Sequence, residues 1–158
     1  KIGLKKITEG HGSFLKGGTQ NNLIIDKLNI LPLICYEVIF TNLVQSSAEA
    51  TNLIVNISED GWFGKSIGPK QHFIHSIFRA IESGKYVIRS ANNGMAAVLN
   101  PLGEIEQKIN FGEDGYIDFN KKKNIDKTFF STFGNLIFVF LILLYIFLII
   151  SFNRVKNE

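Results

Sequence analysis

The chain has 158 residues, of which 46% are hydrophobic, 12% aromatic and 20% charged, with a formal net charge of +3. This length excludes an array of domains, and three prolines with modest charge exclude a disordered chain. A single cysteine excludes an internal disulfide framework and a cysteine-rich zinc site, and the lack of a basic stripe interleaved with aromatics argues against nucleic-acid binding.

Short apolar runs alternate with helical patterns along residues 1–128. The predicted strands are Asn22–Leu28, Ile30–Ile34, Asn52–Ile57, Lys85–Ser90, Met95–Leu99 and Gly115–Phe119. One helix is predicted over Phe40–Ala50, and a second begins at Pro69 and ends at Gly84. Its apolar stripe comprises Phe73, Ile74, Ile77, Phe78 and Ile81. Strand, helix, strand, helix and a final meander predict an α/β fold.

Residues 129–152 contain no charged side chain. A helix of ~20 apolar residues crosses a ~30 Å hydrocarbon layer, and this segment is long enough to do so with some tilt. Residues 1–128 are too few to cover such a helix on all sides, so a buried soluble helix is the weaker interpretation. The sequence therefore predicts a globular part over 1–128, a transmembrane helix over 129–152 and a polar tail over 153–158.

Lysines flank the predicted span unequally. Lys121, Lys122, Lys123 and Lys127 precede it, whereas Arg154 and Lys156 follow it. On this charge count alone, the globular part would face the cytoplasm.

Cys35 ends an apolar strand, immediately before polar residues begin. In α/β folds the carboxyl ends of strands open onto a crevice, where reactive groups are found. A thiol there is a candidate nucleophile if a base or positive charge activates it, and Glu37 is close enough in sequence to turn back beside it. The alternative is that Cys35 is a small buried hydrophobic residue.

Five motifs follow one another in order around this cysteine. They are Leu-Ile-Cys-Tyr-Glu at 33–37, Asn-Leu-Ile-Val-Asn-Ile-Ser-Glu-Asp-Gly-Trp-Phe-Gly at 52–64, Gly-Pro-Lys-Gln-His-Phe at 68–73, Arg-Ala-Ile-Glu at 79–82 and Arg-Ser-Ala-Asn-Asn-Gly at 89–94. Together they resemble the second half of a nitrilase-superfamily (carbon–nitrogen hydrolase) domain, and most of all the apolipoprotein N-acyltransferase family. The resemblance is dense over residues 31–103, and a C-terminal membrane span fits the same family. It implies the second half of an αββα sandwich followed by one transmembrane helix.

The resemblance implies a Glu–Lys–Cys mechanism without a cofactor or metal. Cys35 matches the nucleophile, which takes an acyl chain from a phospholipid as a thioester. The α-amine of a diacylglyceryl-cysteine lipoprotein then attacks the thioester. Glu37 matches the supporting acidic residue, and Tyr36 between them helps to shape the pocket. The family location is the bacterial inner membrane, with several spans in the full-length protein and the catalytic domain on the periplasmic side, against the lysine count.

One departure from the family pattern is serious. The general-base glutamate and the oxyanion-stabilising lysine belong to earlier strands and loops, upstream of residue 1. Glu9 and the lysines at 1, 5 and 6 lie between the family's lysine and its cysteine, so neither role is carried over to them. We expect the sequence to be the C-terminal part of a longer enzyme and to lack activity by itself.

Aromatic and polar residues near the motifs have narrower expectations. Trp62 and Phe63 follow a strand end and are expected to line an acyl-chain pocket, with plain core packing as the alternative. Asn56 and Asp60 are expected to hold the loop through hydrogen bonds to the backbone. Arg79 and Glu82 are expected to form an ion pair, and Arg89 with Asn92-Asn93-Gly94 is expected to order the strand and turn beside the site.

Two other functions stay open at this point. One is a membrane-anchored amidase or nitrilase that hydrolyses a small amide, although soluble amidases have no need of a span. The other is an anchored module that keeps the fold without the chemistry.

Overall fold

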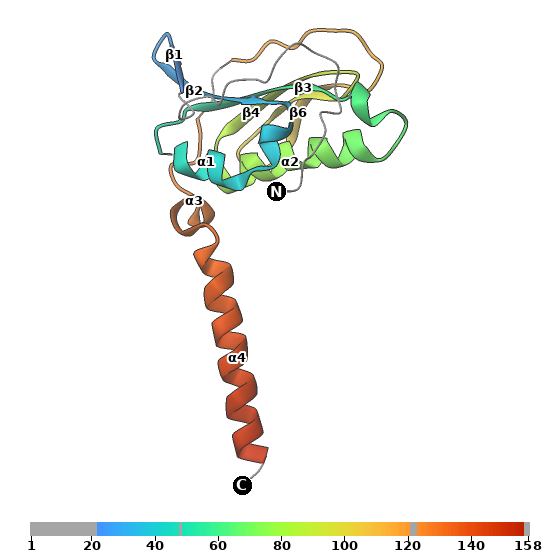
Figure 1. The fold of residues 1–158 in the computed structure, drawn as a ribbon. Helices are drawn as coiled ribbons and strands as arrows, with labels where there is room; N and C mark the ends of the chain where they lie inside the picture. The colour runs from blue at the N-terminus through green and yellow to red at the C-terminus, as the bar shows by residue number, and fades with distance from the viewer. Residues whose placement is uncertain (1–21, 48, 121–122, 157–158) are drawn as a thin grey trace, which may run out of the picture.

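The computed structural model describes residues 22–47, 49–120 and 123–156, which form one mixed β-sheet, helices on one face of it, and a long C-terminal helix (Figure 1). The sheet has six strands in the order β1-β2-β3-β4-β5-β6. The strands are β1 Leu23–Ile25, β2 Leu28–Ile34, β3 Leu53–Glu59, β4 Tyr86–Asn92, β5 Ala96–Leu99 and β6 Ile105–Ile109. The helices are η1 Cys35–Ile39, α1 Thr41–Ser47, η2 Gly61–Phe63, α2 Gly68–Ser83, α3 Phe129–Phe133 and α4 Leu136–Lys156.

Strands β2, β3 and β4 are parallel, and the other pairings are antiparallel. The register sets Leu33 beside Asn56 and Asn56 beside Arg89. Because parallel strands end at the same edge, Cys35 after β2, Asp60 after β3 and Asn92 at the end of β4 meet there. The predicted α/β class is confirmed, and this edge positions the candidate site.

Gly84 lies at the predicted C-terminal end of α2, and Gly103 lies in the turn between β5 and β6. Gly84 ends α2 with a φ of 68°, and its N–H donates to the Ala80 carbonyl at 2.9 Å. Gly103 has a φ of 82°, and its N–H donates to the Asn100 carbonyl at 2.9 Å. Both glycines adopt the left-handed conformation that favours this residue.

The predicted strand Gly115–Phe119 is wrong. No strand forms over Gly115–Phe119; Ile117 and Phe119 instead pack through their side chains against Leu53, Tyr86 and Val98. Alternation of buried side chains imitates a strand pattern there without backbone pairing. The last strand is β6, Ile-Glu-Gln-Lys-Ile, which is mostly exposed and whose three central residues are polar, so its sequence lacks the apolar alternation of a half-buried strand.

The predicted strand Asn22–Leu28 is a hairpin. Asp26 and Lys27 both have positive φ values, 46° and 69°, and they turn β1 back onto β2. Paired left-handed residues are typical of a two-residue hairpin loop, but the usual sequence signal is a glycine, which is missing here.

The apolar stripe predicted for α2 is only partly in the core. Phe73 is buried and Ile77 packs against the core, but Ile74, Phe78 and Ile81 are 44%, 48% and 45% exposed. The side of α2 that faces the sheet is largely polar, with His72, Ser76, Arg79 and Ser83 buried. Polar groups of the strands satisfy these side chains, so this side of the helix can be buried.

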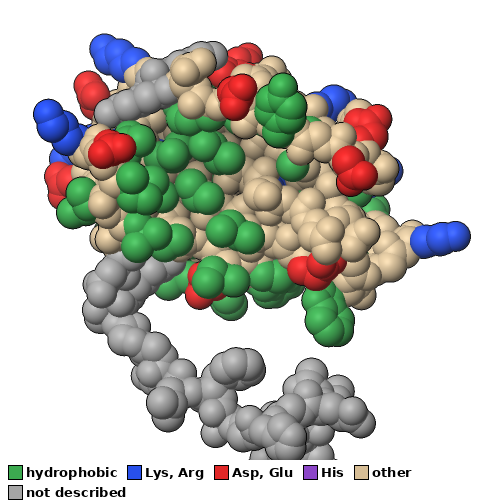
Figure 2. Space-filling model, turned by 90° about the horizontal axis from the view of Figure 1, so that it is seen from above, with side chains coloured by type: hydrophobic (Ala, Val, Ile, Leu, Met, Phe, Trp, Pro, Cys, Tyr) green, Lys and Arg blue, Asp and Glu red, His purple; other side chains and the backbone are tan. Residues whose placement is uncertain are grey.

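The opposite face of the sheet is apolar and partly uncovered. Figure 2 shows hydrophobic side chains gathered on it, and Ile34 and Ile57 are 66% and 59% exposed. A sheet that is apolar on both faces needs a layer on each. This is the surface expected of one half of an αββα sandwich.

Helix α4 is long and apolar enough to cross a membrane, judged by its length and composition. Its window Leu136–Asn153 has a mean hydropathy of 2.8, and none of it is buried. Residues 129–133 form the separate helix α3, and Gly134, with a φ of 50°, lies between the two. The continuous helix therefore begins seven residues after the predicted start at Phe129. The division into a globular part, a span and a tail stays a prediction.

Candidate active site

Cys35 is the first residue of η1 and forms a sharp turn directly after β2. Its φ is 50°, in the left-handed region that a side chain other than glycine seldom adopts, and its thiol is half-buried and free. Such a conformation costs about 1–3 kcal/mol and persists only where surrounding contacts enforce it. The contacts around Cys35 therefore indicate which residues shape the site.

Glu37 holds the turn from the β2 side. Its carboxylate accepts a hydrogen bond from the Ile34 backbone N–H at 2.8 Å, directly before Cys35. The expectation that Glu37 turns back beside the cysteine agrees with this contact. Tyr36 is 52% exposed, and its ring lies 5.6 Å from that of His72.

Two buried side chains hold the Cys35 carbonyl. Asn56 Nδ2 donates to it at 3.2 Å and to the Leu33 carbonyl at 3.0 Å, which agrees with the backbone-binding role expected for Asn56. His72 Nε2 also lies 3.2 Å from the Cys35 carbonyl oxygen. Together with Glu37, these contacts enforce the left-handed turn that presents the thiol.

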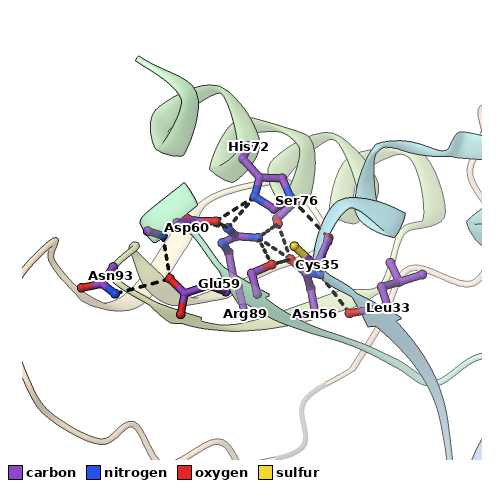
Figure 3. A network of polar contacts seen from close by, with 11 residues as sticks. Leu33, Cys35, Asn56, Glu59, Asp60, His72, Ser76, Arg89 and Asn93 are labelled. Atoms are coloured by element: carbon purple, nitrogen blue, oxygen red, sulfur yellow. Dashed lines mark hydrogen bonds and ion pairs between the residues drawn. The ribbon is translucent and has the colours of Figure 1, made fainter. Parts of the chain in front are cut away.

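Asn56 and His72 belong to a buried polar cluster, which we call the Arg89 network: Asn56, Ser58, Asp60, His72, Ser76 and Arg89 (Figure 3). Arg89 donates to both Asp60 carboxylate oxygens, at 2.9 and 2.8 Å, and to Asn56 Oδ1. Asp60 Oδ1 lies 2.8 Å from His72 Nδ1. The Arg89 and Asp60 side chains are fully buried, so the charge of each side chain is compensated by the opposite charge of the other.

The His72 ring is fixed on both sides by acceptors. Asp60 faces Nδ1 and the Cys35 carbonyl faces Nε2, so each contact is satisfied when the nitrogen concerned carries a proton. Asp60 was expected to bind the backbone, but its carboxylate binds Arg89 and His72 instead. Its role is to anchor the ring that holds the Cys35 turn.

Glu59 joins the ends of β3 and β4, a role that the sequence motifs alone do not predict. Its carboxylate accepts from the Gly61 N–H at 2.6 Å and from the Asn92 and Asn93 side chains. The Gly61 hydrogen bond, followed by those two amides, lowers the pKa of Glu59. The sequence signal was a carboxylate at the end of an apolar strand, and the structure places it opposite the Asn92-Asn93-Gly94 turn.

Gly94 closes this turn tightly over the Arg89 network. A Cβ at this position would lie 2.1 Å from Asp60 Oδ2. Only glycine leaves room for the Asp60 carboxylate, which supports the expectation that residues 92–94 order the site.

The two aromatics after β3 differ in exposure. Trp62 is 83% exposed, whereas the half-buried Phe63 packs against Gly68 and its ring lies 5.6 Å from that of His72. A pocket of about 400 Å³ opens beside them. It is lined by Tyr36, Phe63, Gly68, Gln71, His72, Ile74 and His75. Of the predicted pocket residues, Tyr36 and Phe63 line it and Trp62 does not.

Two further expectations concern the helix and metal binding. Arg79 and Glu82 form the predicted ion pair at 2.7 Å, and Arg79 also donates to Thr41 Oγ1 at 2.8 Å. Within the ranges that the structure describes, no three His, Cys, Asp or Glu side chains are grouped as a metal site requires. Glu9 and the lysines at 1, 5 and 6 lie outside those ranges.

Comparison with known proteins relates the chain to one family. Two proteins named apolipoprotein N-acyltransferase are similar to it: that of Rickettsia bellii (strain RML369-C) is 43% identical over 93% of this chain, and that of Rickettsia prowazekii (strain Madrid E) is 44% identical over 95%. The chain spans 28% and 32% of their lengths.

A solved structure shares the fold. Saccharomyces cerevisiae Nit3, a member of branch 10 of the nitrilase superfamily, aligns with a TM-score of 0.55 and 21% identity, covering 62% of this chain and 39% of that one. Residues 13–120 match the carbon-nitrogen hydrolase family. With Cys35 at the carboxyl edge of a nitrilase-type sheet, the chain belongs to the carbon-nitrogen hydrolase family.

Proposed function

We propose that this chain is part of a membrane N-acyltransferase in which Cys35 carries the acyl group. The observation that supports this most directly is the strained turn at Cys35, held by Glu37, Asn56 and His72. Backbone strain that surrounding side chains maintain is typical of catalytic positions. The similarity to proteins named apolipoprotein N-acyltransferase favours acyl transfer over other reactions of the family.

The reaction has two steps. The Cys35 thiolate attacks the ester carbonyl of a phospholipid, the C–S bond forms, the ester C–O bond breaks, and the leaving lysophospholipid oxygen takes a proton. The α-amine of a diacylglyceryl-cysteine lipoprotein then attacks the thioester carbonyl and loses a proton; the C–N bond of the amide forms, and the C–S bond breaks with the Cys35 thiolate as leaving group. This second step returns Cys35 to its starting state.

The proton transfers and the oxyanion need groups besides those around Cys35. The His72 ring is already engaged by Asp60 and by the Cys35 carbonyl. We assign the general base to a glutamate and oxyanion stabilisation to a lysine, both in the part of the full-length protein that this chain does not span. The chain by itself is then inactive.

The acyl chain is bound next to the cysteine. Tyr36 and Phe63 line the pocket beside it, and the exposed Trp62 contacts the lipid outside it. Burial, followed by the charges of Arg79 and His72, lowers the pKa of His75. A lowered pKa favours the neutral form of His75, which is the form that costs less to desolvate against an apolar chain.

The protein acts in the bacterial inner membrane, held there by α4, with the globular part on the periplasmic side. Helix α4 has the length and composition for this role. The full-length protein has several spans, and these override the local lysine count in setting the orientation.

The function is tested by transfer of a labelled acyl chain. Full-length protein is incubated with phospholipid labelled in its acyl chain and with a diacylglyceryl lipopeptide. We expect the label to be transferred to the peptide α-amine. Without peptide, we expect the label to stay bound to the protein and to be released by neutral hydroxylamine, which cleaves thioesters. Hydrolysis of small amides with no labelled peptide would instead support the amidase alternative, and neither activity would support a non-catalytic module.

Glu37→Gln is expected to lower acyl transfer at least about tenfold while the protein stays folded. The amide can still accept from the Ile34 N–H, but a charge-assisted hydrogen bond is about twice as strong as a neutral one. Transfer rate and thermal unfolding midpoint are measured together, with Glu113→Gln as the matched control, because the exposed Glu113 carboxylate also accepts from the backbone N–H three residues before it, that of Asn110, at 3.0 Å. Equal activity of the Glu37→Gln and wild-type proteins would show that the carboxylate charge is not needed.

A further inference from the structure

Helix α2 presents an apolar side to the outside of the domain. Ile74, Phe78 and Ile81 recur at i, i+4 and i+7 and are 44%, 48% and 45% exposed. The other side of the helix carries the buried residues His72, Ser76 and Arg79 and packs on the sheet. A helix on a globular protein usually turns its apolar side inward. This reversed arrangement indicates that a further apolar layer covers the outer side.

Leu102 extends this apolar area. It is 65% exposed, and the adjacent Gly103 lies against Ile77 and Ile81. We call Ile74, Phe78, Ile81 and Leu102 the α2 outer surface. Ile74 also lines the pocket beside Cys35, so the outer surface reaches the candidate active site.

The α2 outer surface faces the side from which α4 leaves the domain. In Figure 1 the sheet lies on one side of α2, and α4 extends away on the other. Hydrogen bonds tie the segment before α4 to the end of α2: the Ile125 N–H donates to the Gly84 carbonyl at 3.0 Å, and Thr128 Oγ1 donates to the Glu82 carbonyl. The apolar helix α4 then begins at Leu136.

Residues suited to a membrane interface lie at both ends of α2. Phe129 and Phe133 of α3 are 67% and 45% exposed, and their rings lie 4.7 Å apart. The exposed Lys70 lies in the first turn of α2, and the exposed Lys123 lies two residues before Ile125, which binds the Gly84 carbonyl at the other end of the helix. Lysines attract anionic headgroups, and apolar side chains enter the boundary between headgroups and acyl chains.

We infer that the α2 outer surface rests on the lipid bilayer where α4 enters it. The inference builds on the proposed membrane location of the full-length protein. If α4 crosses the bilayer upright, the helix layer of the domain is the layer nearest the lipid. Ile74, Phe78 and Ile81 then lie in the interfacial region, and the pocket beside Cys35 opens at the membrane surface. An acyl chain reaches that pocket without crossing water.

The experiment measures lipid contact at single positions. The full-length protein, with Cys35→Ser, receives one new cysteine labelled with an environment-sensitive fluorophore and is reconstituted into phosphatidylcholine–phosphatidylglycerol vesicles. Acyl chains with or without bromine report direct lipid contact by quenching. We expect Phe78→Cys to give blue-shifted emission that brominated lipid quenches, with Ile81→Cys as a second position.

Two control positions distinguish lipid contact of the α2 outer surface from the membrane location on which the inference rests. Leu141→Cys in α4 is expected to be quenched if the helix spans the membrane. Tyr116→Cys, 87% exposed and on the other face of the sheet, is expected not to be quenched.

Each other combination of emission and quenching at positions 78 and 141 contradicts a specific part of the inference. Quenching at 141 with water-like emission at 78 overturns the inference and leaves the membrane location intact. Blue-shifted but unquenched emission at 78 overturns it by showing that protein, such as a second copy or another span, covers this surface. No quenching at 141 contradicts the membrane location itself.

Discussion

Cys35→Ala in the full-length protein is expected to lower acyl transfer on the order of 10⁴-fold or more and to prevent the hydroxylamine-sensitive acyl adduct. Alanine has no nucleophilic atom, so the thioester cannot form. Transfer rate and bound label are measured with labelled phospholipid. Retained transfer in the alanine variant would mean that the acyl group passes directly, or through another residue, and would contradict the proposed mechanism.

The backbone at Cys35 supplies the control for this experiment. Alanine keeps the left-handed conformation at a similar cost and leaves the carbonyl to Asn56 and His72, so the unfolding midpoint is expected to change little. Cys35→Gly removes the conformational cost, and the glycine variant is expected to be at least as stable as the alanine variant and equally inactive. A glycine variant clearly less stable than the alanine variant would show that the turn is not strained.

The location of the site follows from local sequence patterns. The predicted strands Ile30–Ile34, Asn52–Ile57 and Lys85–Ser90 end shortly before Cys35, Asp60 and Asn92, and in the parallel sheet these ends share one edge. These features depend on residues near one another in the chain. The left-handed conformation of Cys35 does not, because contacts with Asn56 and His72, far along the chain, enforce it.

The inverted burial of α2 could not be predicted from its own periodicity. The apolar stripe indicates a buried face, but His72 and Ser76 face the sheet because Asp60 and Arg89 offer them partners. The one available signal was Arg89 itself, a charged residue that directly follows the apolar run Tyr86–Ile88 and lies beside Asn56 in register. A buried arginine needs a carboxylate and hydrogen-bond acceptors from the elements packed around it.

Arg89→Met is expected to destabilise the globular part by about 3–5 kcal/mol, because it leaves the buried Asp60 carboxylate without its main partner. Asn56 and His72 lose an anchor in the same change, so transfer activity is expected to fall as well. The thermal unfolding midpoint of the full-length protein in detergent measures the first effect. Lys127→Met is the matched control, because Lys127 pairs with Glu49 on the surface, and its midpoint is expected not to change measurably.

The double variant Arg89→Met with Asp60→Asn keeps this prediction testable if Arg89→Met alone does not fold. Removing both charges leaves no unpaired buried ion, so the double variant is expected to be more stable than Arg89→Met. Its activity is nevertheless expected to stay low, because the Asp60 carboxylate no longer fixes His72 against the Cys35 carbonyl. A midpoint for Arg89→Met equal to that of the wild type, or a double variant with full activity, would show that the Arg89 network does not hold the Cys35 turn.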